Sequence, residues 1–135
     1  MELLERHDTN AVAYLTMNAP ERLNALSDEM LAALQYQFEA LRDTASVRAV
    51  VLAGAGKAFC AGHDLKQMTA GRQAPDGGKA YFRDLFDRCA TMMQTIQSLP
   101  QPVIARLASS TRKRFWIDQA IRFFIVHIVS NQGTL

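Results

Sequence analysis

Apolar and polar residues recur along the chain with two different periods, and these periods predict its elements. Residues 11–17 (AVAYLTM) alternate as in a β-strand, whereas residues 48–54 (RAVVLAG) are almost continuously apolar, as in a strand buried on both faces. Between them, Ser27 is a suitable N-cap for a helix over residues 28–42. The apolar residues of this helix recur at helical spacing: Met30, Leu31, Leu34, Phe38 and Leu41. A strand, a helix and a second strand predict a crossover within a mostly parallel sheet.

The rest of the pattern predicts two more helices and another buried strand. A glycine-rich loop over residues 54–62 precedes Asp64, which is placed to cap a short helix. After a polar loop at 71–78 comes the clearest helical pattern of the chain. Its apolar face, which we interpret as core packing, consists of Phe82, Leu85, Phe86, Cys89, Met92, Met93 and Ile96. The prolines of LPQP end this helix, and residues 102–106 predict the next strand.

Composition and charge narrow the class of protein. A chain of 135 residues suits one domain, and 49% hydrophobic with 21% charged residues is ordinary for a globular one. The net charge of +2, without a basic stripe, predicts no nucleic-acid partner, and no segment predicts a membrane partner. Cys60 and Cys89 make neither a disulfide framework nor a metal-ligand cluster, so no metal site is predicted. The first ten residues do not resemble a targeting signal, so we expect a cytoplasmic location if they are the native start.

The stretch AFCAGHDL at residues 58–65 is the candidate for chemistry. Small residues surround its glycine, so a ligand can approach the backbone N–H groups closely. Such donors stabilise a carbonyl oxygen that develops negative charge, and the N-terminus of the helix capped by Asp64 adds partial positive charge. The residues alone leave a plain strand-to-helix connection as the alternative.

Two phosphate-binding alternatives fail on their residues. A Walker loop requires serine or threonine after its Gly-Lys pair, but alanine follows Lys57. A dinucleotide fingerprint that begins at Gly54 requires glycine where Phe59 stands. We therefore exclude both kinds of loop.

Three segments resemble successive signatures of the crotonase (enoyl-CoA hydratase/isomerase) superfamily, in the same order and with similar spacing. They are LTMNAPERLNAL (15–26), VVLAGAGKAFCAGHDL (50–65) and LPQPVIA (99–105). With histidine in its variable position, the loop motif most resembles the subgroup called enoyl-CoA hydratase domain-containing protein 3. The resemblance implies an α/β fold: the N-terminal portion of a crotonase-like (ClpP/crotonase) ββα spiral, truncated. It divides the chain into an acyl-CoA domain portion at 1–106 and a divergent tail at 107–135.

The resemblance also implies an acyl-CoA site. The residue between the loop glycine and the aspartate donates an oxyanion-hole N–H in that family, and here it is His63, whose ring either faces solvent or packs. The other residues that match CoA-contacting segments are Arg22, Leu23, Ala25, Ala61, Asp64 and Leu65. For Arg22 a phosphate contact and an ordinary solvated arginine both stay open, and Asn24 and Asp64 also suit turn and cap roles. Coenzyme A is part of the substrate here, with no separate cofactor.

The chain departs from the family pattern after Arg106. The family continues with a glycine-rich turn, which supplies a second oxyanion N–H, and a helix with acid/base carboxylates. Here RLASSTRKRFWIDQ contains no glycine, and no glutamate follows Glu39. The resemblance thus implies a protein that acts on or binds acyl-CoA thioesters, impaired by truncation. The alternatives are a non-catalytic CoA-ester-binding or oligomerising module, or a non-functional reading frame; family members are normally homo-oligomers, as trimers or dimers of trimers.

Overall fold

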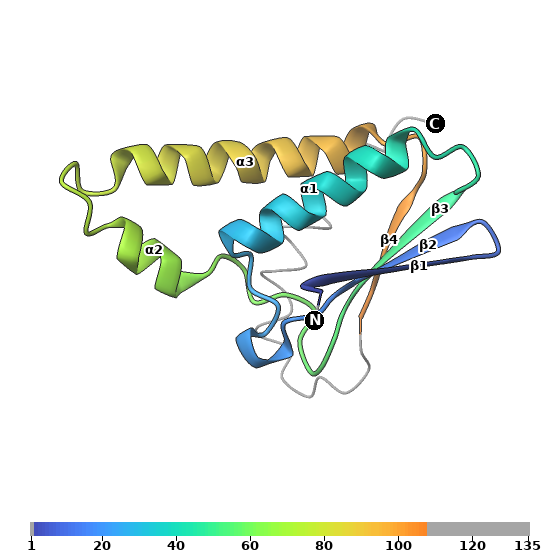
Figure 1. Cartoon of the computed structure of the whole chain (residues 1–135), viewed down its shortest axis with the longest axis horizontal. Coiled ribbons are helices and arrows are strands. Elements are labelled where there is room, and N and C mark those ends of the chain that lie inside the picture. The colour runs from blue at the N-terminus through green and yellow to red at the C-terminus, as the bar shows by residue number, and fades with distance from the viewer. Residues whose placement is uncertain (1, 108–135) are drawn as a thin grey trace.

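The computed structural model describes residues 2–107, which form four strands, three α-helices and one 3-10 helix (Figure 1). The elements are β1 (Leu4–Thr9), β2 (Val12–Met17), the 3-10 helix η1 (Pro20–Arg22), α1 (Asp28–Arg42), β3 (Ala49–Gly54), α2 (Leu65–Gly71), α3 (Lys79–Ser98) and β4 (Val103–Arg106). Within residues 2–107, no helix is both long and apolar enough to cross a membrane. The divergent tail beyond Leu107 lies outside the described residues.

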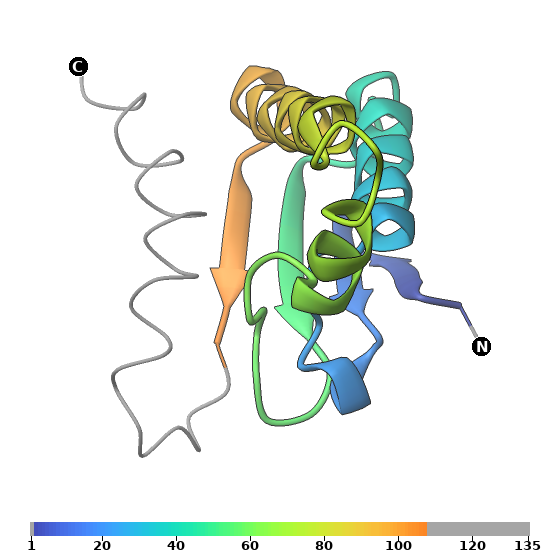
Figure 2. The ribbon, with the colours of Figure 1, turned by 90° about the vertical axis from the view of Figure 1, so that its left-hand side faces the viewer.

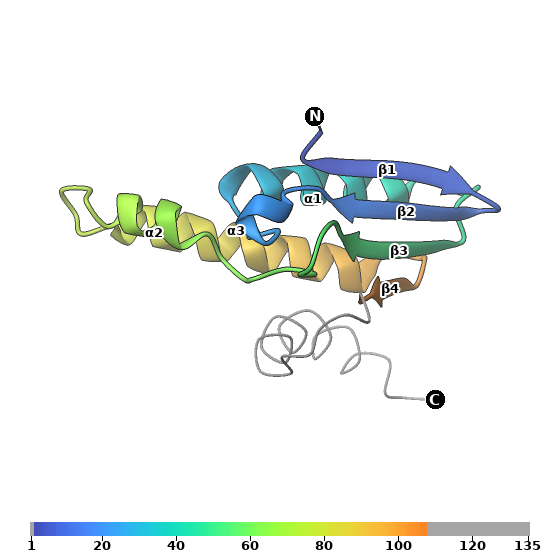
Figure 3. The ribbon, with the colours of Figure 1, turned by 90° about the horizontal axis from the view of Figure 1, so that it is seen from below.

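One sheet with the strand order β1-β2-β3-β4 organises the fold (Figure 3). β1 pairs with β2 antiparallel, whereas β2, β3 and β4 pair parallel in sequence. The mostly parallel sheet predicted from the apolar runs is therefore confirmed. In the β2–β3 register Met17 lies opposite Gly54, so both strands end at the same edge of the sheet.

Helices α1 and α3 lie side by side along one face of the sheet (Figures 1 and 2). The core lies between these helices and the strands. β2 presents alternate residues to it, because successive strand side chains point to opposite faces. The side chains with no exposed surface include Leu15, Met17, Leu34, Phe38, Leu41 and Met92.

The helix predicted over residues 28–42 is confirmed with these bounds. The Ser27 hydroxyl accepts a hydrogen bond from the N–H of Met30 at 3.1 Å, which satisfies one of the otherwise unpaired amides of the first turn. All the apolar residues predicted for its core face are buried. At the other end, the side-chain amide of Gln101 donates to the carbonyl oxygen of Leu41 at 2.8 Å.

Two features differ from the sequence prediction. β1 was not predicted, because in LERHDT only Leu4 is buried and the strand lacks an apolar face. It pairs through a hairpin whose turn residues Asn10 and Ala11 adopt positive φ angles of 50° and 62°. The prediction that Phe86 belongs to the core is wrong, since 51% of the residue is exposed. The first half of α3 extends past the ends of the strands, where the sheet no longer covers it (Figure 1).

Candidate functional site

Two loops leave the sheet at the edge where β2 and β3 end. One carries η1 and leads into α1; the other connects β3 to α2. The N–H of Ala55 donates to the carbonyl oxygen of Met17 at 2.8 Å, so the loops begin side by side. Because parallel strands bring their carboxyl ends together, segments far apart in sequence meet here, as ligand-binding loops of parallel sheets do.

Asn24 holds the two loops together. Its side chain is fully buried, and its Oδ1 accepts a hydrogen bond from the N–H of Ala19 at 2.9 Å. Its Nδ2 donates to the carbonyl oxygens of Ala55 and Ala58 at 2.9 and 2.8 Å. The residue has a positive φ of 52°, a conformation that asparagine tolerates better than most residues. The turn role predicted for Asn24 is confirmed.

A short ladder of backbone hydrogen bonds continues this connection. The N–H of Leu26 donates a hydrogen bond to the carbonyl oxygen of Gly62 at 2.7 Å, and the carbonyl oxygen of Leu26 accepts one from the N–H of Asp64 at 3.2 Å. Leu26 and His63 thus form an isolated parallel bridge. Since the residues on either side of His63 supply the groups that bond to Leu26, the N–H of His63 is directed to the opposite side.

Glycines let the second loop approach the first. A Cβ atom on Gly54 would lie 2.4 Å from the carbonyl oxygen of Phe59 and 2.7 Å from Nδ2 of Asn24, so no side chain fits there. Gly62 has a φ of +94°, and its Cβ position has no atom within 4 Å. Only the backbone conformation therefore requires glycine directly before His63.

The carboxylate of Asp64 both caps a helix and forms an ion pair. Its Oδ1 accepts hydrogen bonds from the N–H groups of Lys66 and Gln67 at 2.9 and 3.1 Å, as an N-cap does. Its Oδ2 pairs with the guanidinium of Arg22. Burial opposes ionisation of this carboxyl, but the hydrogen bonds from Gln67, Arg22 and Lys66 outweigh it and lower its pKa. The predicted cap role is confirmed.

A groove of about 670 Å³ lies over these loops, and every residue predicted for the site lines it. These residues are Arg22, Leu23, Ala25, Ala61, His63, Asp64 and Leu65. Glu21 and Lys66 line it as well and were not predicted. Each of them is the sequence neighbour of a predicted residue, and this position next to the motifs is the feature of the sequence that could have identified them. The groove shows that the residues share a surface, whereas their contacts with a ligand stay predictions.

The ring of His63, a half-buried residue of the groove, packs against a ring of α3. It lies edge-on to the ring of Phe86 in α3, with centroids 5.8 Å apart and an interplanar angle of 74°. Burial lowers the pKa of the imidazole, so the ring is neutral at neutral pH.

Cys60 is not a candidate nucleophile. It is buried, and burial raises its pKa to about 11 even though its Sγ accepts a hydrogen bond from the N–H of Gly62 at 3.4 Å. The thiol therefore stays protonated at neutral pH. Among residues 2–107, no group of three or more His, Cys, Asp or Glu side chains could hold a metal ion.

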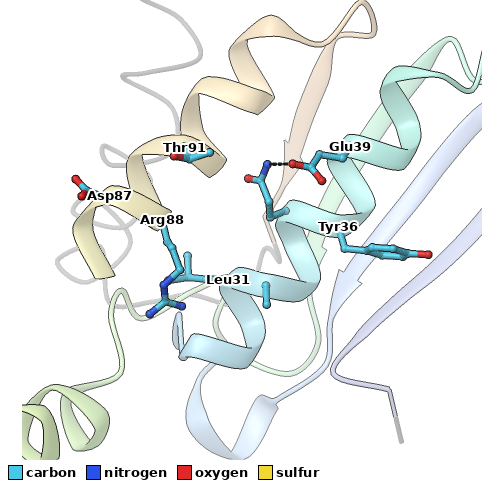
Figure 4. Close-up of a pocket in the computed structure, with 8 residues that line it drawn as sticks. Leu31, Tyr36, Glu39, Asp87, Arg88 and Thr91 are labelled. Carbon is cyan, nitrogen blue, oxygen red and sulfur yellow. Dashed lines mark hydrogen bonds between the residues drawn. The ribbon is translucent and has the colours of Figure 1, made fainter. Parts of the chain in front are cut away.

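A second groove of about 440 Å³ runs between α1 and α3, away from the loops. Leu31, Glu39, Asp87, Arg88 and Thr91 are among its lining residues (Figure 4). Arg88 of α3 bridges the helices through its ion pair with Asp28 of α1 at 2.7 Å, and it also pairs with Asp84 of its own helix at 2.7 Å. None of the residues predicted for the site lines this second groove.

Comparisons with known proteins agree with the three sequence signatures. The profile of the family "Enoyl-CoA hydratase/isomerase" matches residues 7–109. Over 98 residues the chain is 34% identical to enoyl-CoA hydratase domain-containing protein 3 of Xenopus laevis. This alignment covers 73% of this chain and 32% of that protein. Over 106 residues it is 36% identical to the 1,2-epoxyphenylacetyl-CoA isomerase of Escherichia coli, in an alignment that covers 77% of this chain and 39% of that protein.

Solved structures extend the agreement to the fold. An enoyl-CoA hydratase of Mycobacterium smegmatis superposes with a TM-score of 0.73 at 51% identity, over 79% of this chain and 40% of that one. The chain thus spans about two-fifths or less of the length of these relatives. The predicted fold, a portion of a crotonase-like α/β spiral, is confirmed. The chain belongs to the enoyl-CoA hydratase/isomerase family.

Proposed function

We propose that the groove binds acyl-CoA thioesters and that the N–H of His63 donates a hydrogen bond to the acyl carbonyl oxygen. The observation that carries this proposal is the gathering of all the predicted site residues on one groove, with that N–H directed away from Leu26. Two relatives are named for acyl-CoA substrates, an epoxyphenylacetyl-CoA isomerase and the dienoyl-CoA isomerase of Mus musculus. Coenzyme A then enters as part of the substrate, without a separate cofactor.

The charges of the groove suit the phosphate groups of coenzyme A. Arg22 and Lys66 are its two cationic side chains. The pair with Asp64 orients the Arg22 guanidinium, while 43% of that side chain stays exposed to solvent. A guanidinium held in this way matches phosphate oxygens with little further loss of conformational freedom.

The proposed contact polarises the thioester but supplies only part of a hydration reaction. A donor aimed at the carbonyl oxygen stabilises the negative charge that develops there. Hydration also requires a pair of acid/base groups. Glu21 and Asp64 are the carboxylates that line the groove, and Asp64 is occupied by its cap and ion pair, so Glu21 has no second carboxylate to act with there. We therefore expect thioester binding with hydration of crotonyl-CoA near background.

A pair of ligands that differ only in the carbonyl tests the contact. Calorimetric titration of the full chain with butyryl-CoA and with the thioether butyl-CoA should show tighter binding of the thioester. The expected preference is about 2- to 10-fold, the contribution of one hydrogen bond. No preference in the native protein would contradict the proposal.

Two substitutions at one position separate the backbone from the ring. His63→Ala keeps the N–H and should retain the preference for the thioester. His63→Pro removes the N–H, so both ligands should bind equally. A preference that survives in His63→Pro would assign the carbonyl contact to another group.

A further inference from the structure

Helix α2 begins two residues after His63, and little apolar packing holds it in place. None of its residues is fully buried, and its first residue, Leu65, is 73% exposed. Met68 packs against the core but is only half-buried. The helix also lies beyond the ends of the strands, where the sheet does not support it (Figure 1). Polar contacts must therefore set the position of α2 and of the loop before it, because a helix gains most of its stability from packing.

The side chain of Gln67 fastens α2 to the first turn of α1. Its Oε1 accepts a hydrogen bond from the N–H of Asp28 at 2.8 Å, and its Nε2 donates to the carboxylate of Glu29 at 3.0 Å. The N–H of Asp28 is one of the first-turn amides that have no partner within their own helix. The backbone N–H of Gln67 donates to Asp64, the cap of α2, at 3.1 Å. Gln67 thus connects the starts of two helices.

This contact replaces a missing step of the ladder between the two loops. In a regular parallel ladder that contains the bridge of Leu26 to His63, the N–H of Asp28 would bond next to the carbonyl oxygen of Asp64. That carbonyl oxygen instead accepts from the N–H of Met68 inside α2 at 3.0 Å. The side-chain oxygen of Gln67 takes its place on Asp28. The ladder therefore ends on a side chain and not on the backbone.

We infer that Gln67 is a positioning residue for the N–H of His63. The inference rests on the proposed function, in which that N–H binds the acyl carbonyl oxygen. The groups that bond to Leu26 lie on either side of His63, and Gln67 makes the next hydrogen bond of the same ladder. Without it, α2 can move away from α1 and the loop can turn. Because hydrogen bonds weaken steeply with misalignment, the contact with the ligand would then weaken.

Glu29 makes this contact sensitive to charge. Hydrogen bonds from its own backbone N–H, from Gln67 and from Ser27 lower the pKa of its carboxyl, so Glu29 is ionised at neutral pH. Gln67→Glu replaces the amide donor by a second carboxylate of nearly the same shape, and repulsion should separate α2 from α1. Adding Glu29→Gln in the same chain exchanges donor and acceptor, so the double variant should restore the contact.

Titration of these variants tests the inference. The probes are butyryl-CoA and the thioether butyl-CoA, added to the full chain, and the ratio of their affinities isolates the carbonyl contact from the rest of the ligand. The native protein should prefer the thioester by about 2- to 10-fold. Gln67→Glu should bind both ligands nearly equally. The double variant Glu29→Gln with Gln67→Glu should regain the native preference.

A control and a measurement without ligand complete the test. Gln73→Glu makes the same charge change at an exposed glutamine in the turn after α2, and it should keep the native preference. Hydrogen exchange follows the ladder itself through the N–H of Asp64, which donates to Leu26. This N–H should exchange faster in Gln67→Glu and at the native rate in the double variant and in Gln73→Glu.

The outcomes separate the inference from the proposal beneath it. If the native protein prefers the thioester and Gln67→Glu keeps the full preference, Gln67 does not position the donor and only the inference is wrong. A native exchange rate of the Asp64 N–H in Gln67→Glu, or a lost preference that the double variant does not regain, would also overturn it. If the native protein binds both ligands equally, the proposed function fails and the inference fails with it.

Discussion

The carboxylate of Asp64 binds the guanidinium of Arg22, and through this pair the cap of α2 is tied to the loop that follows β2. The two residues are 42 positions apart in sequence, and their side chains are unequally accessible, with 43% of Arg22 exposed against 6% of Asp64. The buried carboxylate thus holds the more accessible cation at the groove. One ion pair thereby links the stability of the loops to the charge of the site.

This ion pair predicts a pH dependence of stability. The pKa of Asp64 is lowered in the folded protein, since hydrogen bonds outweigh the opposing effect of burial. Such a carboxyl contributes stability that is fully present above its unfolded pKa of about 3.9 and is lost as the pH falls through the folded value. Native protein should therefore lose more unfolding free energy than Asp64→Asn as the pH is lowered from about 5 into the acid range. Urea unfolding at a series of pH values measures this difference.

Asp43→Asn is the control for that experiment, because Asp43 is an exposed aspartate at the end of α1. The unfolding free energy of this variant should change with pH in the same way as that of the native protein. If that of Asp64→Asn does so as well, the ion pair and cap do not stabilise the folded state.

Asn24→Ala should destabilise the protein by about 2–4 kcal/mol in denaturant unfolding, because it leaves a buried N–H and two carbonyl groups without their partner. Asn10→Ala is a matched control, since Asn10 has nearly the same φ of 50° but is exposed on the hairpin turn. Both variants place alanine at positive φ, so their difference reports the hydrogen bonds. Equal losses would show that the hydrogen bonds of Asn24 contribute nothing net.

Three glycine variants should differ in a defined order. Gly54→Ala should be the most destabilising, because its Cβ would lie 2.4 Å from a backbone oxygen. Gly62→Ala and Gly77→Ala have open space but positive φ values of 94° and 70°, so each should cost about 1–2 kcal/mol. Thermal unfolding measures the order, and a Gly54→Ala variant as stable as the other two would contradict it.

The same variants bear on the site. Gly62 precedes His63, so a shift in its backbone re-aims the proposed donor, whereas Gly77 lies in the turn before α3. Gly62→Ala should weaken butyryl-CoA binding, and Gly77→Ala should not. Calorimetric titration measures the affinity of both variants for butyryl-CoA. Equal affinities would show that the loop glycine does not position a group that binds the ligand.

Both cysteines should resist alkylation in the folded protein. Burial raises the pKa of Cys60 to about 11 and also raises that of Cys89. Because the thiolate is the reacting species, labelling by iodoacetamide near pH 8 should be on the order of 100-fold slower than in urea. Mass spectrometry of time points measures both sites. Rapid labelling of Cys60 in native buffer would mean that the loop opens readily.

Local features of the sequence determined much of the fold. The bounds of α1 follow from the Ser27 cap and the spacing of its apolar residues, both of which act within a few residues. Asp64 was predicted as a cap for the same reason. β1 could not be predicted in this way, since its stability comes from pairing with β2 and not from an apolar face of its own.

The motifs also named the residues of the groove, whereas only the tertiary structure decided how they meet. Parallel pairing of β2 with β3 brings Arg22 to Asp64 and sets Leu26 beside His63. The exposure of Phe86 was likewise decided by the fold, because helical spacing defines an apolar face but not where the sheet that covers it ends. Periodicity acts within one element, and the site depends on contacts between elements that only the folded chain brings together.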